Sequence, residues 1–322
     1  MNAKKICYCL LAGVLAIGSF TGCGNSGAKK VSVPINVAAL NGPTGMGMVK
    51  LMEDESDKYN ISLYQSPDEI VGKLVSGEID IACIPSNLAA VLYNKTQKGI
   101  TLLGTNTLGV LYIVENGETI KSLADLKGKT IIMSGKGATP EFILDTVLAS
   151  AGLDVARDVT VEFMANHTDV ASKVITNPGT IALLPEPHVS IAEAKAKTVK
   201  VAIDMNAAWQ ESQKTDLPMG VIVARNDFIK EKGKDLGAFL ESYKKSVAFV
   251  NKNVDEAAAL IAKHKIIPNA AVAKKAIPKC NIVFKDAKES KDSINKFYEV
   301  ISKIDPKSVG GSIPDEAFYG ER

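Results

Sequence analysis

The chain has 322 residues, which is the length of two ordinary domains. Its 46% hydrophobic and 23% charged residues are typical of a packed globular chain and exclude a disordered, collagen-like or multispan membrane protein. Lysine and arginine number 38 and aspartate and glutamate 36, so the net charge of +2 gives no electrostatic reason to expect nucleic acid as a partner.

The first residues have the pattern of an export signal. Lys4 and Lys5 are followed by an apolar run over 6–17, which is too short to span a bilayer comfortably. Small residues then precede Cys23, which resembles a lipobox, although Phe20 stands where an aliphatic residue is usual. The pattern predicts a lipoprotein whose Cys23 carries lipid chains such as palmitate. This lipid would anchor the protein on the extracytoplasmic face of the cell membrane. An ordinary secretory signal or a short membrane anchor is the alternative.

Cleavage before Cys23 would remove residues 1–22 and leave 23–32 as a small, polar, flexible tether. The removed part holds two of the 38 basic residues and no acidic one, so the remainder carries a formal charge of zero. Cys83 lies in an apolar run and is expected to be a buried hydrophobe. Whether it pairs with Cys280 is left open, since two leftover cysteines carry no spacing information.

Beyond residue 31, short apolar runs alternate with amphipathic stretches, which is the pattern of an α/β fold. Ser66 is expected to cap a helix that stops at Gly77. Strands are expected over 33–40, 61–65, 79–84 and 108–114, with helices over 46–55, 67–75 and 86–93.

The same alternation continues into a second series. A glycine-rich turn over 134–139 leads into a helix, and it is not a phosphate-binding P-loop because the required residue order is absent. Strands are expected over 129–133, 159–163, 180–184 and 199–203, with a helical turn over 122–126 and helices over 141–151 and 168–175. The last third is then expected to hold a strand over 221–224, helices over 239–251, 254–263 and 294–304, and a coiled tail.

Four stretches stand out, in this order: Leu74–Ala82 (LVSGEIDIA), Ser122–Thr130 (SLADLKGKT) with Ala149–Leu153 (ASAGL) downstream, Leu184–Pro187 (LPEP) and Val221–Ile229 (VIVARNDFI). Together they resemble the extracytoplasmic solute-binding proteins of ABC importers. The branch that they resemble handles nitrate, sulfonate and thiamine-precursor-type solutes. The resemblance covers roughly residues 33–265.

The resemblance implies a two-domain periplasmic-binding-protein (type II-like) fold with the ligand in a cleft between the domains. Domain one would comprise residues 33–115 and 221–322, and domain two residues 116–220. It further implies a monomer that captures a small organic solute by hinge closure and delivers it to an ABC permease in the membrane. Neither an enzyme, a cofactor nor a metal is expected.

Ligands of open α/β sheets bind outside the carboxyl ends of the strands, and this rule selects candidate contacts. After the first strand, the turn offers glycine amides and a hydroxyl, and glycine lets the backbone approach a ligand closely. After the third strand, two side chains can donate and accept. The candidates in this first series are Asn41, Gly42, Thr44, Gly45, Ser86 and Asn87.

In the second series, amides at the start of a helix suit an oxyanion or a carbonyl group. Glu186 lies between two prolines at a strand end, where it could accept a hydrogen bond from a ligand or form a hinge or interdomain ion pair. Tyr112 and Trp209 are candidate stacking walls, although Tyr112 fits the core equally well. The candidates in this second series are Tyr112, Gly137, Thr139, Asn166, Glu186 and Trp209.

Two other classes of function stay open. Pyrimidine-forming or hydrolytic enzymes use the same scaffold, but neither HExxH nor GxSxG is present, and His167 and His188 lack a useful metal-ligand spacing. A sensory lipoprotein that signals to a membrane kinase is the other class. Among solutes, a sulfonate and a nitrogen heterocycle such as an aminopyrimidine compete.

Overall fold

The computed structural model describes residues 34–320, and residues 34–322 belong to one compact unit. The expected signal peptide, the lipidated Cys23 and the tether therefore lie outside the described residues. Within the described part of the chain, no helix has both the length and the apolar character needed to cross a membrane.

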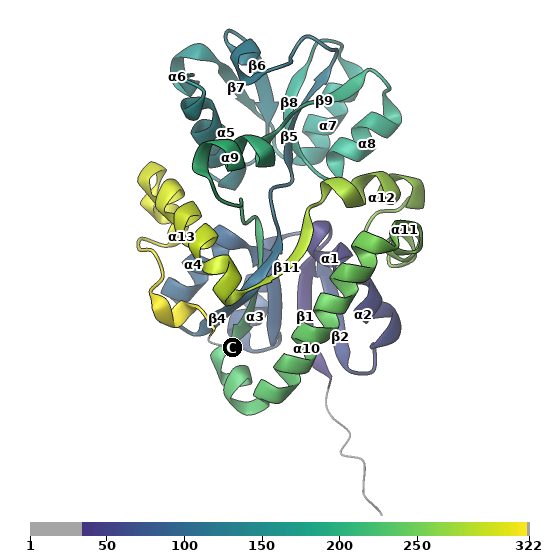
Figure 1. Cartoon of the computed structure of the whole chain (residues 1–322), viewed down its shortest axis with the longest axis vertical. Coiled ribbons are helices and arrows are strands. Elements are labelled where there is room, and N and C mark those ends of the chain that lie inside the picture. The colour runs from purple at the N-terminus through teal and green to yellow at the C-terminus, as the bar shows by residue number, and fades with distance from the viewer. Residues whose placement is uncertain (1–33, 321–322) are drawn as a thin grey trace, which may run out of the picture. The chain divides into compact units, whose positions relative to one another are not determined.

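Two sheets organise the fold (Figure 1). The first has six strands in the order β11-β4-β10-β3-β1-β2, in which β2, β1 and β3 run parallel and β10 joins them antiparallel. Its strands are β1 (Ile35–Leu40), β2 (Tyr59–Tyr64), β3 (Ile81–Pro85), β4 (Ile100–Thr107), β10 (Gly220–Arg225) and β11 (Ile282–Asp286).

The second sheet has five strands in the order β7-β6-β8-β5-β9. Its parallel part comprises β7, β6 and β8, and β5 pairs antiparallel with β8. Its strands are β5 (Leu111–Asn116), β6 (Thr130–Met133), β7 (Thr160–Phe163), β8 (Ile181–Pro185) and β9 (Val199–Asp204). The domain boundaries expected at 115/116 and 220/221 stay a prediction.

Helices cover both faces of each sheet (Figure 1), and short 3₁₀ turns, labelled η, occur between some of the elements. In the first half of the chain they are α1 (Pro43–Met46), α2 (Val49–Asp54), α3 (Pro67–Ser76), α4 (Ser86–Lys95), η1 (Leu123–Leu126), α5 (Thr139–Ser150) and α6 (Val155–Asp158). In the second half they are α7 (His167–Thr176), α8 (His188–Lys195), α9 (Met205–Gln213), α10 (Asn226–Lys252), α11 (Val254–Lys263), α12 (Ala270–Ala276), η2 (Ile277–Lys279), α13 (Ala287–Ile304), η3 (Pro306–Val309) and η4 (Glu316–Phe318).

The hydrophobic core runs continuously from one sheet to the other. One cluster of buried side chains includes Leu102 of the first sheet, Ile131 of the second, and the ring pair of Trp209 on α9 and Phe297 on α13. These two rings lie edge to face with centroids 5.9 Å apart, a favoured aromatic geometry. Two further clusters fill the outer faces, one under α10 to α12 and one under α7 and α8.

The local signals at the third helix are confirmed. Ser66 accepts a hydrogen bond from the backbone of Asp68, and Glu69 bonds back to the backbone of Ser66, which makes a capping box. Gly77 ends the helix in the left-handed conformation at φ 84°, which costs glycine least. Cys83 is buried as expected, and it and Cys280 are free thiols.

Several elements differ from the sequence prediction. The strands β4 and β11 were not predicted, because β4 carries Gly104 and three polar residues near its end. Gly104 is needed there, since a Cβ atom at this position would lie 2.2 Å from the carbonyl oxygen of Lys285 on β11. Helices α6, α8, α9 and α12 were also missed, and α10 begins at Asn226 rather than at 239, with a kink at Lys232.

Candidate functional site

A pocket opens where the two sheets meet, beside the places where the chain passes from one sheet to the other. Its volume is about 210 Å³. An apolar cavity of roughly 150 Å³ is enough to hold benzene, so this pocket fits a single substituted ring. The lining residues are Leu40, Asn41, Gly42, Pro43, Thr44, Pro85, Thr107, Val110, His167, Pro185, Glu186, Pro187, His188, Met219 and Gly220.

The first sheet contributes the end of β1 and the start of α1. Asn41, Gly42 and Thr44 all line the pocket. The Thr44 hydroxyl exchanges hydrogen bonds of 3.2 Å with the backbone of Leu40, so it is already engaged in closing the turn. Gly45 lies just behind, where a Cβ atom would come 2.8 Å from the Leu40 carbonyl oxygen. The turn is therefore held tightly against the strand.

The second sheet contributes two histidines. The rings of His167, which begins α7, and His188, which begins α8, lie 5.6 Å apart. Burial lowers the pKa of His167 to about 4, and it also lowers the pKa of His188. Both imidazoles are therefore uncharged at neutral pH. The Oγ of Ser134, after β6, lies 2.6 Å from Nδ1 of His167.

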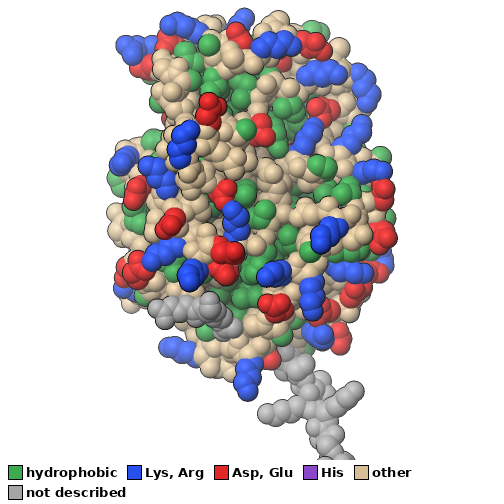
Figure 2. Space-filling model, in the orientation of Figure 1, with side chains coloured by type: hydrophobic (Ala, Val, Ile, Leu, Met, Phe, Trp, Pro, Cys, Tyr) green, Lys and Arg blue, Asp and Glu red, His purple; other side chains and the backbone are tan. Residues whose placement is uncertain are grey.

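The pocket walls are apolar and carry no fixed positive charge. Four prolines line it, and neither lysine nor arginine is among the lining residues. The lining includes one acidic residue, Glu186. On the face seen in Figure 2, basic and acidic side chains are interspersed over the surface. A lining without a cation favours a neutral ring over a small anion, because an anion would lose its hydration without gaining a positive partner.

Glu186 lies at the pocket wall with its carboxylate turned into the protein. The side chain is fully buried and accepts hydrogen bonds from the backbone and hydroxyl of Ser190. Its Oε1 lies 3.9 Å from the ammonium group of Lys279, which bonds Glu193 at 2.6 Å. Burial raises the pKa of Glu186 to about 7. The 3.9 Å contact with Lys279 supports the ion-pair role, and the ligand-contact role stays a prediction.

Ser86 and Asn87 of the first series and Tyr112 of the second do not line the pocket. Ser86 is buried and donates to the carbonyl of Pro218 at 2.6 Å, which ties α4 to the segment before β10. Asn87 follows on the same helix and is partly exposed. Tyr112 lies in β5, and its hydroxyl donates to the backbone carbonyl of Lys279 at 2.8 Å.

The remaining candidates of the second series are engaged elsewhere. The Gly137 amide donates to the carboxylate of Glu141, and Thr139 is buried at the start of α5. The Asn166 side chain caps α7 by accepting from the backbone of Asp169. Trp209 is fully buried against Phe297 in the core. The structure thus gathers Asn41, Gly42, Thr44 and Glu186 at the pocket and leaves these four outside its lining.

Sequence reasoning missed part of the lining. Thr107 and Val110 flank the passage from β4 to β5, and Met219 and Gly220 lie at the passage into β10. No local motif marks such a passage, although the polar end of β4 is a usable signal. The Thr107 hydroxyl is buried without a hydrogen-bond partner in the described structure.

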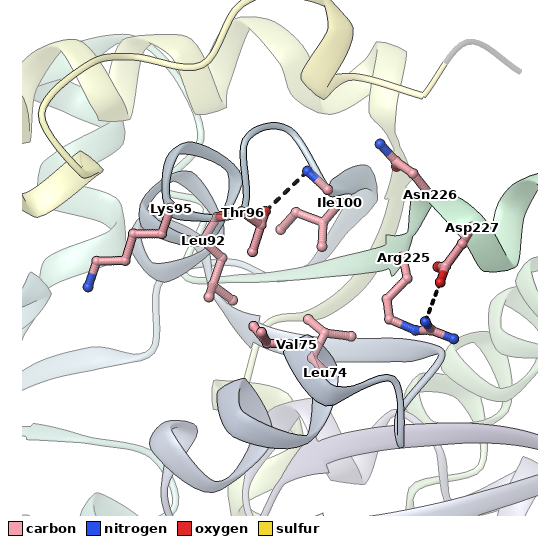
Figure 3. A pocket seen from close by; sticks show the side chains of 10 residues that line it. Leu74, Val75, Leu92, Lys95, Thr96, Ile100, Arg225, Asn226 and Asp227 are labelled. Carbon is pink, nitrogen blue, oxygen red and sulfur yellow. Dashed lines mark hydrogen bonds and ion pairs between the residues drawn. The ribbon is translucent and has the colours of Figure 1, made fainter.

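A second pocket, of about 470 Å³, lies at the opposite end of β10 (Figure 3). Arg225 reaches along its edge, but its guanidinium is already bonded to Asp227, Asp80 and the Ile79 carbonyl. Thr96 likewise bonds the backbone of its own turn. Because Arg225 and Thr96 are already bonded within the protein, this pocket is the weaker candidate for a ligand.

The fold has well-matched relatives among solved structures. An ABC transporter from Parabacteroides distasonis is 25% identical, with a TM-score of 0.79, over 90% of this chain and 100% of that one. The periplasmic aliphatic sulphonate binding protein SsuA from Escherichia coli is 18% identical, with a TM-score of 0.67, over 87% and 96%. The expected fold, α/β with the periplasmic-binding-protein architecture, is confirmed.

A family model for menaquinone biosynthesis matches residues 46–303. The chain belongs to this menaquinone biosynthesis family. No curated protein matches the sequence. The family and the solved relatives agree on a binding-protein fold and support a ligand-binding function.

Membership of the menaquinone biosynthesis family corrects one expectation. We expected the chain not to be an enzyme, and that expectation is wrong, because the family is an enzyme-related one named for a biosynthetic pathway. The sequence left an enzyme only as an alternative, because neither HExxH nor GxSxG is present.

Proposed function

We propose that this protein binds a small, flat, uncharged ring compound, such as a nitrogen heterocycle, in the pocket between its two sheets. The observation that carries the proposal is the lining: four prolines, two uncharged histidines, and neither lysine nor arginine. Proline faces pack well against a flat ring, and neutral imidazoles bond its polar edge. A sulfonate would bring a full negative charge to walls without a cation.

As part of the same proposal, the protein is a lipoprotein anchored through Cys23 that closes around its ligand and delivers it to an ABC permease. The fold of ABC-transporter relatives supports this role. Intact mass measurement of the chain from membranes tests the anchor. A lipid on Cys23 that disappears in Cys23→Ser would support it, and an unmodified Cys23 in the membrane fraction would contradict it.

The family supports a second candidate function, which is chemistry on the molecule bound in the same pocket. Glu186, with a pKa of about 7, is a group that can exchange a proton near neutral pH, and it lines the pocket together with two neutral histidines. The two candidate functions differ in whether the bound compound is released unchanged or as a product. Any compound that binds should be incubated with the full chain and analysed by mass spectrometry, because recovery unchanged supports delivery and conversion supports catalysis.

A further inference from the structure

His167, which lines the pocket, is held by a hydrogen bond to a buried serine. The Oγ of Ser134 lies 2.6 Å from Nδ1 of His167, and Ser134 is only 3% exposed. Within residues 34–320, this is the one hydrogen bond that the structure gives to the Ser134 hydroxyl. The bond joins the end of β6 to the first residue of α7.

Which of the two groups donates in this bond follows from the burial of the serine hydroxyl. A buried hydroxyl proton without an acceptor costs free energy, and Nδ1 is the acceptor that lies within reach. If Nδ1 instead carried the proton, the serine hydrogen would be left unpaired. Ser134 therefore donates, and the single proton of the neutral ring resides on Nε2.

With Nδ1 occupied by Ser134, Nε2 is left as the hydrogen-bond donor of a ring that lines the pocket. His167 lines the pocket, and no described residue forms a hydrogen bond with its Nε2. The neighbouring ring of His188 lies 5.6 Å away between centroids and is likewise uncharged. An N–H group of this kind is satisfied by an acceptor on a bound molecule.

We propose that Ser134 is a positioning residue that fixes His167 as a hydrogen-bond donor, so that the pocket selects ring compounds carrying an acceptor, such as a carbonyl or an unprotonated ring nitrogen. This inference rests on the proposed ligand-binding function and narrows the class of ligand. It assigns a role to Ser134 without placing it in contact with the ligand.

The tautomer can be read without any ligand. Nitrogen-15 NMR of the histidine-labelled full chain at pH 7.5 should show a pyridine-like Nδ1 and a pyrrole-like Nε2 for His167. In Ser134→Ala the two tautomers should mix, and Ser134→Thr, which keeps the hydroxyl, should restore the single tautomer. A wild-type His167 protonated at Nδ1 overturns the proposal even if no variant folds.

The selection of acceptors needs two probes of the same shape. Pyridine offers a ring nitrogen and benzene does not, and pyridine is uncharged at pH 7.5. Pyridine should bind about 3- to 10-fold more tightly than benzene to the wild-type chain, a ratio worth one hydrogen bond. Ser134→Ala should lower that ratio toward one.

The binding results distinguish the selection of acceptor-bearing rings from ring binding itself. Equal binding of both probes overturns the selection of acceptors and leaves the pocket as a ring-binding site. Failure of both probes to bind argues against the proposed function itself, and it also overturns the ligand class stated here. The tautomer measurement stands independently of either result.

Discussion

Tyr112 of the five-stranded sheet donates a hydrogen bond of 2.8 Å to the backbone carbonyl of Lys279, in the turn that leads into the six-stranded sheet. The side chain of the same lysine bonds Glu193 at 2.6 Å and lies 3.9 Å from the buried Glu186. Lys279, which precedes β11 of the six-stranded sheet, thus bonds both β5 and α8 on the side of the five-stranded sheet. These contacts link the pocket wall at Glu186 to the six-stranded sheet.

Removing the Tyr112 hydroxyl should weaken this link. Tyr112→Phe deletes one donor and leaves the Lys279 carbonyl unpaired, so the free energy of unfolding should fall by about 1 kcal/mol. Urea denaturation measures this. Tyr64→Phe is the control, because the described structure gives the Tyr64 hydroxyl no hydrogen bond, and equal losses in both variants would refute a role for the bond.

Glu186 should respond in opposite directions to its two charged neighbours. Lys279 lowers its pKa and Glu193 raises it, against a dominant effect of burial that raises it. Lys279→Met should therefore raise the pKa of Glu186 above about 7, and Glu193→Gln should lower it. Carbon-13 NMR titration of the carboxyl group measures both. If both variants shifted the pKa of Glu186 in the same direction, they would be acting by disturbing the packing around Glu186 rather than through charge.

The raised pKa of Glu186 also affects stability. The folded state holds the proton more tightly than the unfolded state, whose pKa is near 4.5. The stabilisation is therefore complete below pH 4.5 and is lost as pH rises through about 7. Glu186→Gln should flatten this part of the stability profile, as measured by unfolding at pH 4.5 to 8, and an unchanged slope would contradict the assignment.

His167 should have the reverse effect. Its folded pKa of about 4 lies below the unfolded value near 6.5, so the unfolded state binds the proton first as pH falls. Stability should be complete above pH 6.5 and decline toward pH 4, with a total of roughly 3 kcal/mol. In His167→Gln the decline over this range should be smaller. Urea denaturation at several pH values measures this decline in stability. An equal decline in the wild-type chain and in His167→Gln would show that burial does not hold the His167 ring neutral.

The close approach of β11 to β4 gives a further prediction. A Cβ atom at Gly104 would meet the Lys285 carbonyl at 2.2 Å, so Gly104→Ala should push the strands apart and destabilise the fold by more than about 2 kcal/mol. Gly72, inside α3, has open space, and Gly72→Ala should stabilise by about 0.5–1 kcal/mol. Thermal unfolding compares the two, and similar effects would contradict the packing described.

The sequence predicted features that depend on neighbouring residues. The Ser66 cap, the stop at Gly77 and most strands of both sheets follow from local chemistry. The rule of strand ends also led to Asn41, Gly42 and Thr44, which the fold brings to the pocket. What depends on distant contacts was not predictable: β4 tolerates Gly104 because β11 lies against it.

The same distinction explains the candidate site. Trp209 looked suited to stack on a ligand, but its partner Phe297 is far along the chain, and their contact buries it in the core. The pairing of His167 with Ser134, and the approach of Lys279 to Glu186, likewise join residues on separate elements. A single sequence gives the residue types, and the fold decides which of them meet.

The central claim is that the pocket between the sheets binds an uncharged ring compound, and thermal unfolding of the full chain tests it most directly. The chain should be screened against nitrogen heterocycles, sulfonates, amino acids and vitamins, with Asn41→Trp as a variant that fills the pocket. A ligand at 100 times its dissociation constant stabilises by about 2.7 kcal/mol. We predict a saturable shift with a heterocycle that Asn41→Trp abolishes. A shift with sulfonates alone, or one that survives in Asn41→Trp, would contradict the account.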